Sequence, residues 1–116
     1  MDLEAIVAAV APKVWETVER HLKRSLSNEE KILVLAIGSA RQPYIWLVKT
    51  LATGAYVQAG ETKFFEADDP SYAAAYRDAF CSLIEKGLLE PFGDKGAYQL
   101  SKKGYEAYSK AVSREP

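Results

Sequence analysis

The first apolar pattern in the chain is a stripe with helical spacing near the N-terminus. Its members recur every three or four residues, as one face of an α-helix requires, and they are Leu3, Ile6, Val7, Val10, Val14, Val18 and Leu22. Pro12 interrupts the stripe, because proline lacks an amide hydrogen and its ring crowds the preceding turn. The pattern predicts a long helix over residues 2–25, kinked or restarted near Ala11.

A second helix is predicted to follow a capping signal. Ser27 and Glu30 have the spacing of a capping box, in which each side chain accepts a hydrogen bond from the other residue's backbone amide. The run from Ile32 to Ile37 is apolar on every side, which is typical of a helix in the middle of a core. We expect this helix to end near Gly38 or Ala40.

Residues 44–66 fit two interpretations. Tyr44, Leu47 and Leu51 have helical spacing, whereas the many β-branched and aromatic residues of this segment favour strands. We favour a hairpin, because Gly54 supplies a flexible reversal and Gly60 interrupts the second half.

The remaining chain predicts a third helix, a hairpin and a closing helix. Asp69 and Pro70 form a start signal for a helix from Ser71 to Lys86, and Gly87 is a typical stop. One face of this helix is apolar and predicted to face the core: Tyr72, Tyr76, Phe80, Leu83 and Ile84. Two short strands, 88–92 and 97–100, flank a glycine-containing turn, and Ser101 is expected to cap the last helix.

Part of this pattern resembles a known family. The span from Ala79 to Leu100, AFCSLIEKGLLEPFGDKGAYQL, followed by SKKGYEAY, resembles the third helix, wing and closing helix of bacterial winged-helix proteins. Residues 45–65 are similar to an inserted hairpin of uncharacterised winged-helix modules attached to larger bacterial proteins. The resemblance implies an α+β, winged-helix-like fold with helices packed on short antiparallel β-hairpins. We expect a winged-helix domain at 27–113, preceded by an N-terminal helical extension at 1–26.

Composition and charge bear on the number of domains, on membrane spans and on the cellular compartment. The 116 residues suit one domain, and 15 basic against 16 acidic residues leave a net charge of −1. The apolar runs are too short to span a bilayer, so no membrane span is expected. The acidic N-terminus and a single cysteine, Cys81, favour the cytoplasm, with Cys81 as a small residue at the edge of the core.

The sequence offers few candidate residues for catalysis or metal binding. His21 is the only histidine, and its position beside the apolar stripe favours a solvated surface role, although a pair with Cys81 stays open. Structural zinc needs four ligands, more than these two residues supply. Asp68 and Asp69 are better explained by helix capping than by a cation. We therefore expect no enzyme activity, no cofactor and no identifiable small-molecule site.

Charge also bears on DNA binding, the common activity of winged helices. Between Glu66 and Glu85 there are five acidic residues and one basic residue, Arg77, a net of −4 that would repel a duplex. Two basic patches elsewhere keep DNA binding as the alternative. The candidate contacts are Arg20, Lys23, Arg24, Lys95, Lys102 and Lys103, with Lys110 and Arg114 further along the last helix.

Protein association is the favoured function. The first helix carries more apolar surface than a small core needs, and Trp15 beside it is a residue type favoured at interface centres. The candidate interface, which would serve a protein partner or a homodimer, consists of Val7, Val10, Val14, Trp15 and Val18. The same stripe fits packing across the domain's own helices equally well. Aromatic residues of the first hairpin, Trp46, Tyr56 and Phe64, form a second candidate surface, although burial in the core is the commoner outcome for such residues. The sequence thus predicts a non-enzymatic adaptor or regulatory module.

Overall fold

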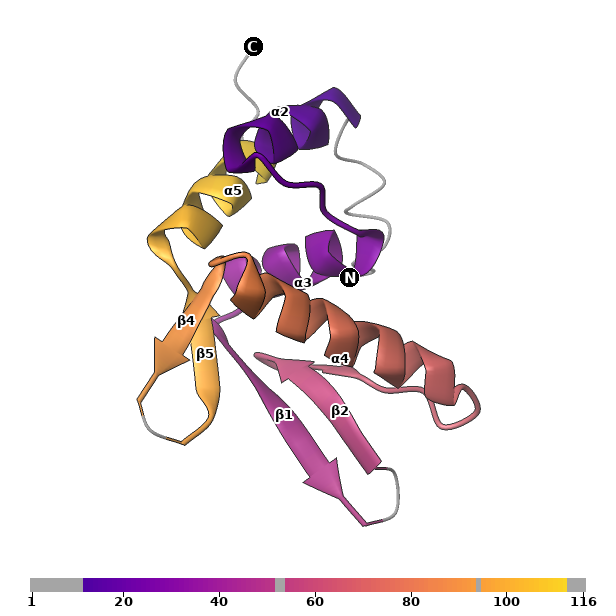
Figure 1. Cartoon of the computed structure of the whole chain (residues 1–116). Helices are drawn as coiled ribbons and strands as arrows, with labels where there is room; N and C mark the ends of the chain where they lie inside the picture. The colour runs from indigo at the N-terminus through magenta and orange to yellow at the C-terminus, as the bar shows by residue number, and fades with distance from the viewer. Residues whose placement is uncertain (1–11, 52–53, 94, 113–116) are drawn as a thin grey trace.

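The computed structural model describes residues 12–51, 54–93 and 95–112, and these form an α+β fold (Figure 1). Its four helices are α2 (Pro12–Leu22), α3 (Asn28–Ser39), α4 (Pro70–Glu85) and α5 (Lys102–Val112). Its five strands are β1 (Tyr44–Thr50), β2 (Gly54–Ala59), β3 (Thr62–Phe64), β4 (Leu89–Phe92) and β5 (Ala97–Leu100). The strands form one antiparallel sheet in the order β3-β2-β1-β5-β4.

Helix α2 ends earlier than the predicted helix over residues 2–25. Its C-terminal end is at Leu22, because Lys23 takes a left-handed backbone conformation with φ of 59°. A residue in that conformation commonly terminates a helix. The predicted helical turns before Pro12 lie outside the described residues.

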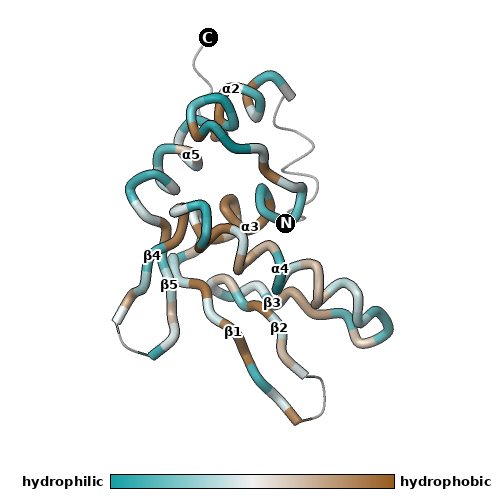
Figure 2. Tube along the Cα trace, in the orientation of Figure 1, coloured by the Kyte–Doolittle hydropathy of each residue, from teal (hydrophilic) through white to brown (hydrophobic). Residues whose placement is uncertain are grey.

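Helix α3 is the centre of the core, as its sequence predicts. The capping box is confirmed, since the Ser27 hydroxyl accepts from the Glu30 amide at 3.1 Å and the Glu30 carboxylate accepts from the Ser27 amide at 2.9 Å. All residues from Ile32 to Ile37 are buried. Figure 2 shows hydrophobic positions along α3 and hydrophilic ones over much of α2.

The segment 44–66 folds as strands, which confirms the hairpin over the helix. Six residue pairs join β1 to β2, from Ile45 opposite Ala59 to Thr50 opposite Gly54. One face of the sheet packs on α4 through two aromatic pairs. The Phe64 and Tyr76 rings lie 4.5 Å apart between centroids, and the Phe80 and Tyr98 rings lie 5.4 Å apart.

Most of the predicted inner face of α4 is buried, but its cysteine is not at the core edge. Tyr76, Phe80 and Leu83 are buried, as predicted. Cys81 is exposed, so its predicted place at the edge of the core is wrong. The reason is rotation along the helix, because each residue is turned by about 100° from the last, and Cys81 follows the inward-facing Phe80.

A buried ion pair joins the two central helices. The Lys86 ammonium, at the end of α4, lies 2.7 Å from Oε2 of Glu30 near the start of α3, and the Glu30 side chain is only 5% exposed. The Ser82 hydroxyl donates to the same carboxylate at 3.1 Å. Burial acts to raise the pKa of Glu30, but the Lys86 hydrogen bond and charge, with the Ser27 amide and the Ser82 hydroxyl, together lower it. The pair's contribution to stability is therefore present above the ordinary carboxyl pKa of 4.5 and is lost as the pH falls through the lowered value.

Lys86→Ala is expected to lower the free energy of unfolding by about 3 kcal/mol near neutral pH, because it leaves the buried carboxylate without its cation. Urea denaturation measures the change. Lys103→Ala, which removes an exposed lysine of α5, is the matched control and should change stability by less than about 0.5 kcal/mol. Equal effects of the two substitutions would contradict a stabilising role of the Lys86–Glu30 ion pair.

Two glycines allow close approach of backbone and rings in the core. A Cβ on Gly104 of α5 would lie 2.3 Å from the Leu88 carbonyl oxygen, and a Cβ on Gly38 of α3 would lie within 2.3 Å of the Tyr108 ring. Both contacts set how closely α5 approaches its neighbours. Real Cβ atoms do not tolerate such distances, so a methyl group at either place requires movement.

Gly104→Ala is expected to lower stability by about 2 kcal/mol, the usual cost of overpacking, despite alanine's better helix propensity. Thermal unfolding followed by circular dichroism measures the change. Ser109→Ala, on the exposed side of the same helix, is the control and should be neutral or slightly stabilising. A stabilised Gly104→Ala variant would show that α5 is free to move away from Leu88.

Candidate functional site

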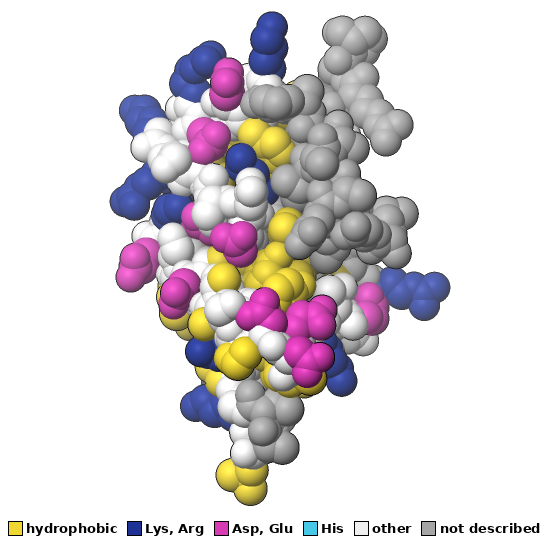
Figure 3. Space-filling model, turned by 90° about the vertical axis from the view of Figure 1, so that its right-hand side faces the viewer, with side chains coloured by type: hydrophobic (Ala, Val, Ile, Leu, Met, Phe, Trp, Pro, Cys, Tyr) yellow, Lys and Arg dark blue, Asp and Glu magenta, His cyan; other side chains and the backbone are white. Residues whose placement is uncertain are grey.

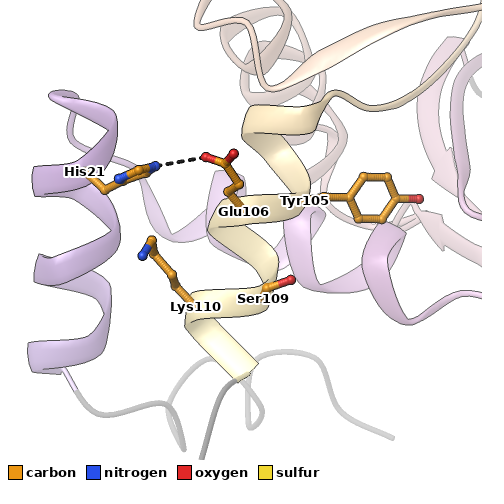
Figure 4. A pocket seen from close by; sticks show the side chains of 5 residues that line it. All are labelled: His21, Tyr105, Glu106, Ser109 and Lys110. Atoms are coloured by element: carbon orange, nitrogen blue, oxygen red, sulfur yellow. Dashed lines mark hydrogen bonds and ion pairs between the residues drawn. The ribbon is translucent and has the colours of Figure 1, made fainter. Parts of the chain in front are cut away.

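Two helices that are far apart in the sequence pack together at one end of the molecule. Helix α2 lies against α5 (Figure 1), and a side-chain contact joins them. Nε2 of His21 lies 3.0 Å from Oε2 of Glu106, as the dashed line in Figure 4 shows. Both side chains remain accessible, at 43% and 42% exposure. His21 is thus at the surface, as predicted, but it has a carboxylate partner rather than water alone.

An open hollow of about 460 Å³ surrounds this contact. Its lining consists of His21 from α2 and four residues of α5, namely Tyr105, Glu106, Ser109 and Lys110 (Figure 4). The hydrogen bond from His21 lowers the pKa of Glu106, with smaller contributions from the charges of His21, Lys102 and Lys110. Among the described contacts, none joins His21 to the hydroxyl of Ser109 or Tyr105. The His21–Glu106 pair is a contact between α2 and α5.

The fold brings most of the predicted basic residues to this end of the molecule. Arg20, Lys23 and Arg24 are exposed at the end of α2, and Lys102 and Lys103 are exposed in the first turn of α5. Residues 12–24 contain four basic and two acidic residues, and α5 contains three basic and one acidic, a net of +4 with His21 neutral. Lys95 is not part of this group, since it lies in the turn between β4 and β5.

The segment from Glu66 to Glu85, which contains α4, carries the opposite charge. The five acidic residues between Glu66 and Glu85 are all exposed. Arg77, the one cation of that segment, donates through its guanidinium to the Ala55 carbonyl of β2 and is half-buried. Figure 3 shows a group of acidic side chains in the lower half of the molecule, whereas most of the side chains at its upper left are basic; both kinds occur in each half. The outer surface of α4 therefore offers no free cation.

The predicted apolar interface needs correction. Trp15 and Val18 are 3% and 0% exposed, because the apolar stripe of α2 belongs to the chain's own core. Val14 is half-buried, and Val7 and Val10 lie outside the described residues. The Lys31 ammonium lies 5.4 Å from the centre of the Trp15 ring, which covers that side chain further.

The second candidate surface is also reduced by burial. Tyr56 and Phe64 are buried, so only Trp46 of that set is partly accessible. Sequence reasoning missed the contact of Lys86 with Glu30, since the capping box alone accounts for Glu30 and nothing in the pattern marks Lys86. It also missed Glu106 as the partner of His21.

Neither a metal-binding cluster among the described residues nor a comparison with known proteins adds a further site. The described residues contain no group of three or more His, Cys, Asp or Glu side chains placed to hold a metal ion. None of the described helices is long and apolar enough to span a membrane. Comparisons with protein-family models, with curated proteins and with solved structures gave no match.

His21→Ala is expected to raise the pKa of the Glu106 carboxyl toward its ordinary value of 4.5, because the hydrogen bond from His21 is the main cause of its lowering. Titration of the side-chain carboxyl carbon by NMR measures the pKa. Lys103→Ala, which does not contribute to the shift, is the control. An unchanged pKa in the His21 variant would mean that α2 and α5 do not hold this contact in solution.

Proposed function

We propose that this chain is a non-catalytic winged-helix module that binds a protein partner as an adaptor or regulatory domain. The element order supports the winged-helix assignment: α3 is followed by β1, α4 by the two-stranded wing β4–β5, and the wing by α5. Strand β1 pairs with β5, which joins the wing to the rest of the sheet. Helix α4 takes the place of the helix that reads DNA in winged-helix proteins.

One observation carries the preference for a protein partner: the outer surface of α4 is acidic and has no free cation. DNA-reading helices present cations to phosphates and amide or guanidinium groups to base edges. Here Arg77 is engaged with Ala55, and Asp78 and Glu85 point to solvent. Between β1 and α4, the described residues form β2 and β3 rather than a helix, so α4 has no preceding helix of a helix-turn-helix.

A photocrosslinking amino acid tests this proposal in cells that produce the chain at its native level. Placed at Glu85 of α4 or at Val48 of β1, it is expected to give adducts that resist nuclease and are digested by protease. Placed at Lys103 of α5, it serves as the control for contact with nucleic acid. Nuclease-sensitive adducts from Lys103, without protein adducts from the other two positions, would refute the proposal.

A second candidate is DNA binding through the α2–α5 end, which the packing of the two basic segments favours. In this case a short duplex at low salt would bind with an affinity that falls steeply as salt rises. The variant Arg20→Ala, Lys23→Ala, Arg24→Ala would then weaken binding, whereas Asp78→Asn would not. We expect instead little affinity at physiological salt and a small effect of the triple substitution, as measured by fluorescence anisotropy.

A further inference from the structure

Strand β1 is the longest strand and is only partly paired on one side. Six of its residues, Ile45 to Thr50, are registered with β2, whereas only Tyr44 and Ile45 are registered with β5. Beyond Ile45 the β1–β2 and β4–β5 hairpins diverge (Figure 1). A stretch of strand edge therefore lies inside the sheet rather than at its margin.

The direction of the backbone groups follows from one hydrogen bond. The Tyr44 carbonyl accepts from the Gly60 amide at 2.9 Å, so the backbone groups of Tyr44 face β2. Consecutive residues of an antiparallel strand face alternate sides, so Ile45, Leu47 and Lys49 face β5. Ile45 is paired with Tyr98, but no described residue pairs with the N–H or C=O of Leu47 or Lys49. Lys49 is exposed and Leu47 is half-buried, which leaves this edge within reach of solvent.

The opposite edge of the same hairpin is protected. Ala55 of β2 lies directly across from Lys49, and its carbonyl accepts from the guanidinium of Arg77. One edge of the hairpin is thus capped by a side chain of α4, whereas no side chain of the described residues caps the edge at Leu47 and Lys49. Unpaired strand edges of this kind template the addition of another strand.

We propose that the β1 edge at Leu47 and Lys49 binds an extended segment of a protein partner, which adds a strand beside β1. This inference rests on the proposed protein-binding function and names its surface. Backbone hydrogen bonds supply the affinity in such strand addition, and side-chain contacts supply the specificity. The exposed Lys49 ammonium forms no ion pair with a described carboxylate, so its charge selects an acidic residue in the bound segment.

The neighbouring side chains favour alternating apolar residues in the bound segment. Trp46 and Val48 are half-buried and lie on the face opposite the buried Ile45. An added strand presents every second side chain to that face. The segment is therefore extended, with apolar residues at alternate positions and an acidic residue near Lys49.

Selection from a phage-displayed library of random linear peptides against the full chain tests the inference. Enriched peptides are expected to carry an acidic residue with alternating apolar ones. Lys49→Pro removes the edge N–H without removing a bond to β2 and should weaken their binding about tenfold or more. Lys49→Glu keeps the backbone intact and should reverse the preference to a basic residue. Circular dichroism checks that both variants remain folded.

Hydrogen exchange of the unliganded chain provides a second measurement. The amides of Leu47 and Lys49 should exchange much faster than those of Trp46 and Val48, which face β2. Binding of a selected peptide should slow the exchange at Leu47 and Lys49. Slow exchange at both positions in the free chain would overturn the inference.

The other outcomes separate this inference from the proposed function. Peptides whose binding is unchanged by both Lys49 substitutions, or protein adducts from Glu85 of α4 alone, would leave the protein-binding function standing and overturn the β1 edge as its surface. Absence of any enriched peptide would also overturn the inference that the β1 edge binds an extended segment. A dimer seen by sedimentation and abolished by Lys49→Pro would identify the occupant as a second copy of the chain and overturn a separate partner.

Discussion

The carboxylate of Glu30 is the contact on which the arrangement of the helices depends. It closes the cap of α3 through the Ser27 amide and, with its other contacts, holds Ser82 and Lys86 of α4. A buried charge of this kind is stabilising only when its partners are all in place. The end of α4 is therefore fixed against the start of α3, and α4 in turn contacts β2, β3 and β4. One side chain thus joins the start of α3 to the end of α4, just before the β4–β5 hairpin.

The distribution of charge separates two parts of the molecule with different properties. The α2–α5 end is basic and carries the His21–Glu106 contact, whereas the exposed side of α4 is acidic. The exposed side of α4 is thus the part least suited to contact with a polyanion. The open edge of β1, at Leu47 and Lys49, is a third part of the surface. There the backbone N–H and C=O groups are the proposed binding groups. These differences are the reason for preferring a protein partner.

Local signals in the sequence predicted most elements, because each depends on neighbouring residues. The Ser27–Glu30 cap, the Asp69–Pro70 start and the β-branched residues of β1 all act within a few positions. The left-handed conformation of Lys23 has no such signal, since lysine rarely adopts it. The end of α2 was therefore misplaced.

Contacts between distant segments account for the remaining errors. The apolar stripe with Trp15 and Val18 fits an interface or a core equally well, and only the packing of α2 in the fold decides for the core. The same holds for Lys86 and Glu106, whose partners lie 56 and 85 residues away. The two-residue junction between β1 and β5, from which the open edge follows, depends on how two separate hairpins meet.

Among the described residues, the basic α2–α5 end and the acidic exposed side of α4 produce local electrostatic potentials of opposite sign. These potentials extend over a Debye length, about 10 Å at 0.1 M salt. They therefore act on a charged molecule before any contact forms. A polyanion is attracted to the α2–α5 end and repelled by the exposed carboxylates of α4, and a polycation experiences the reverse. Weak encounters in a crowded solution are therefore oriented, even where they lead to no complex.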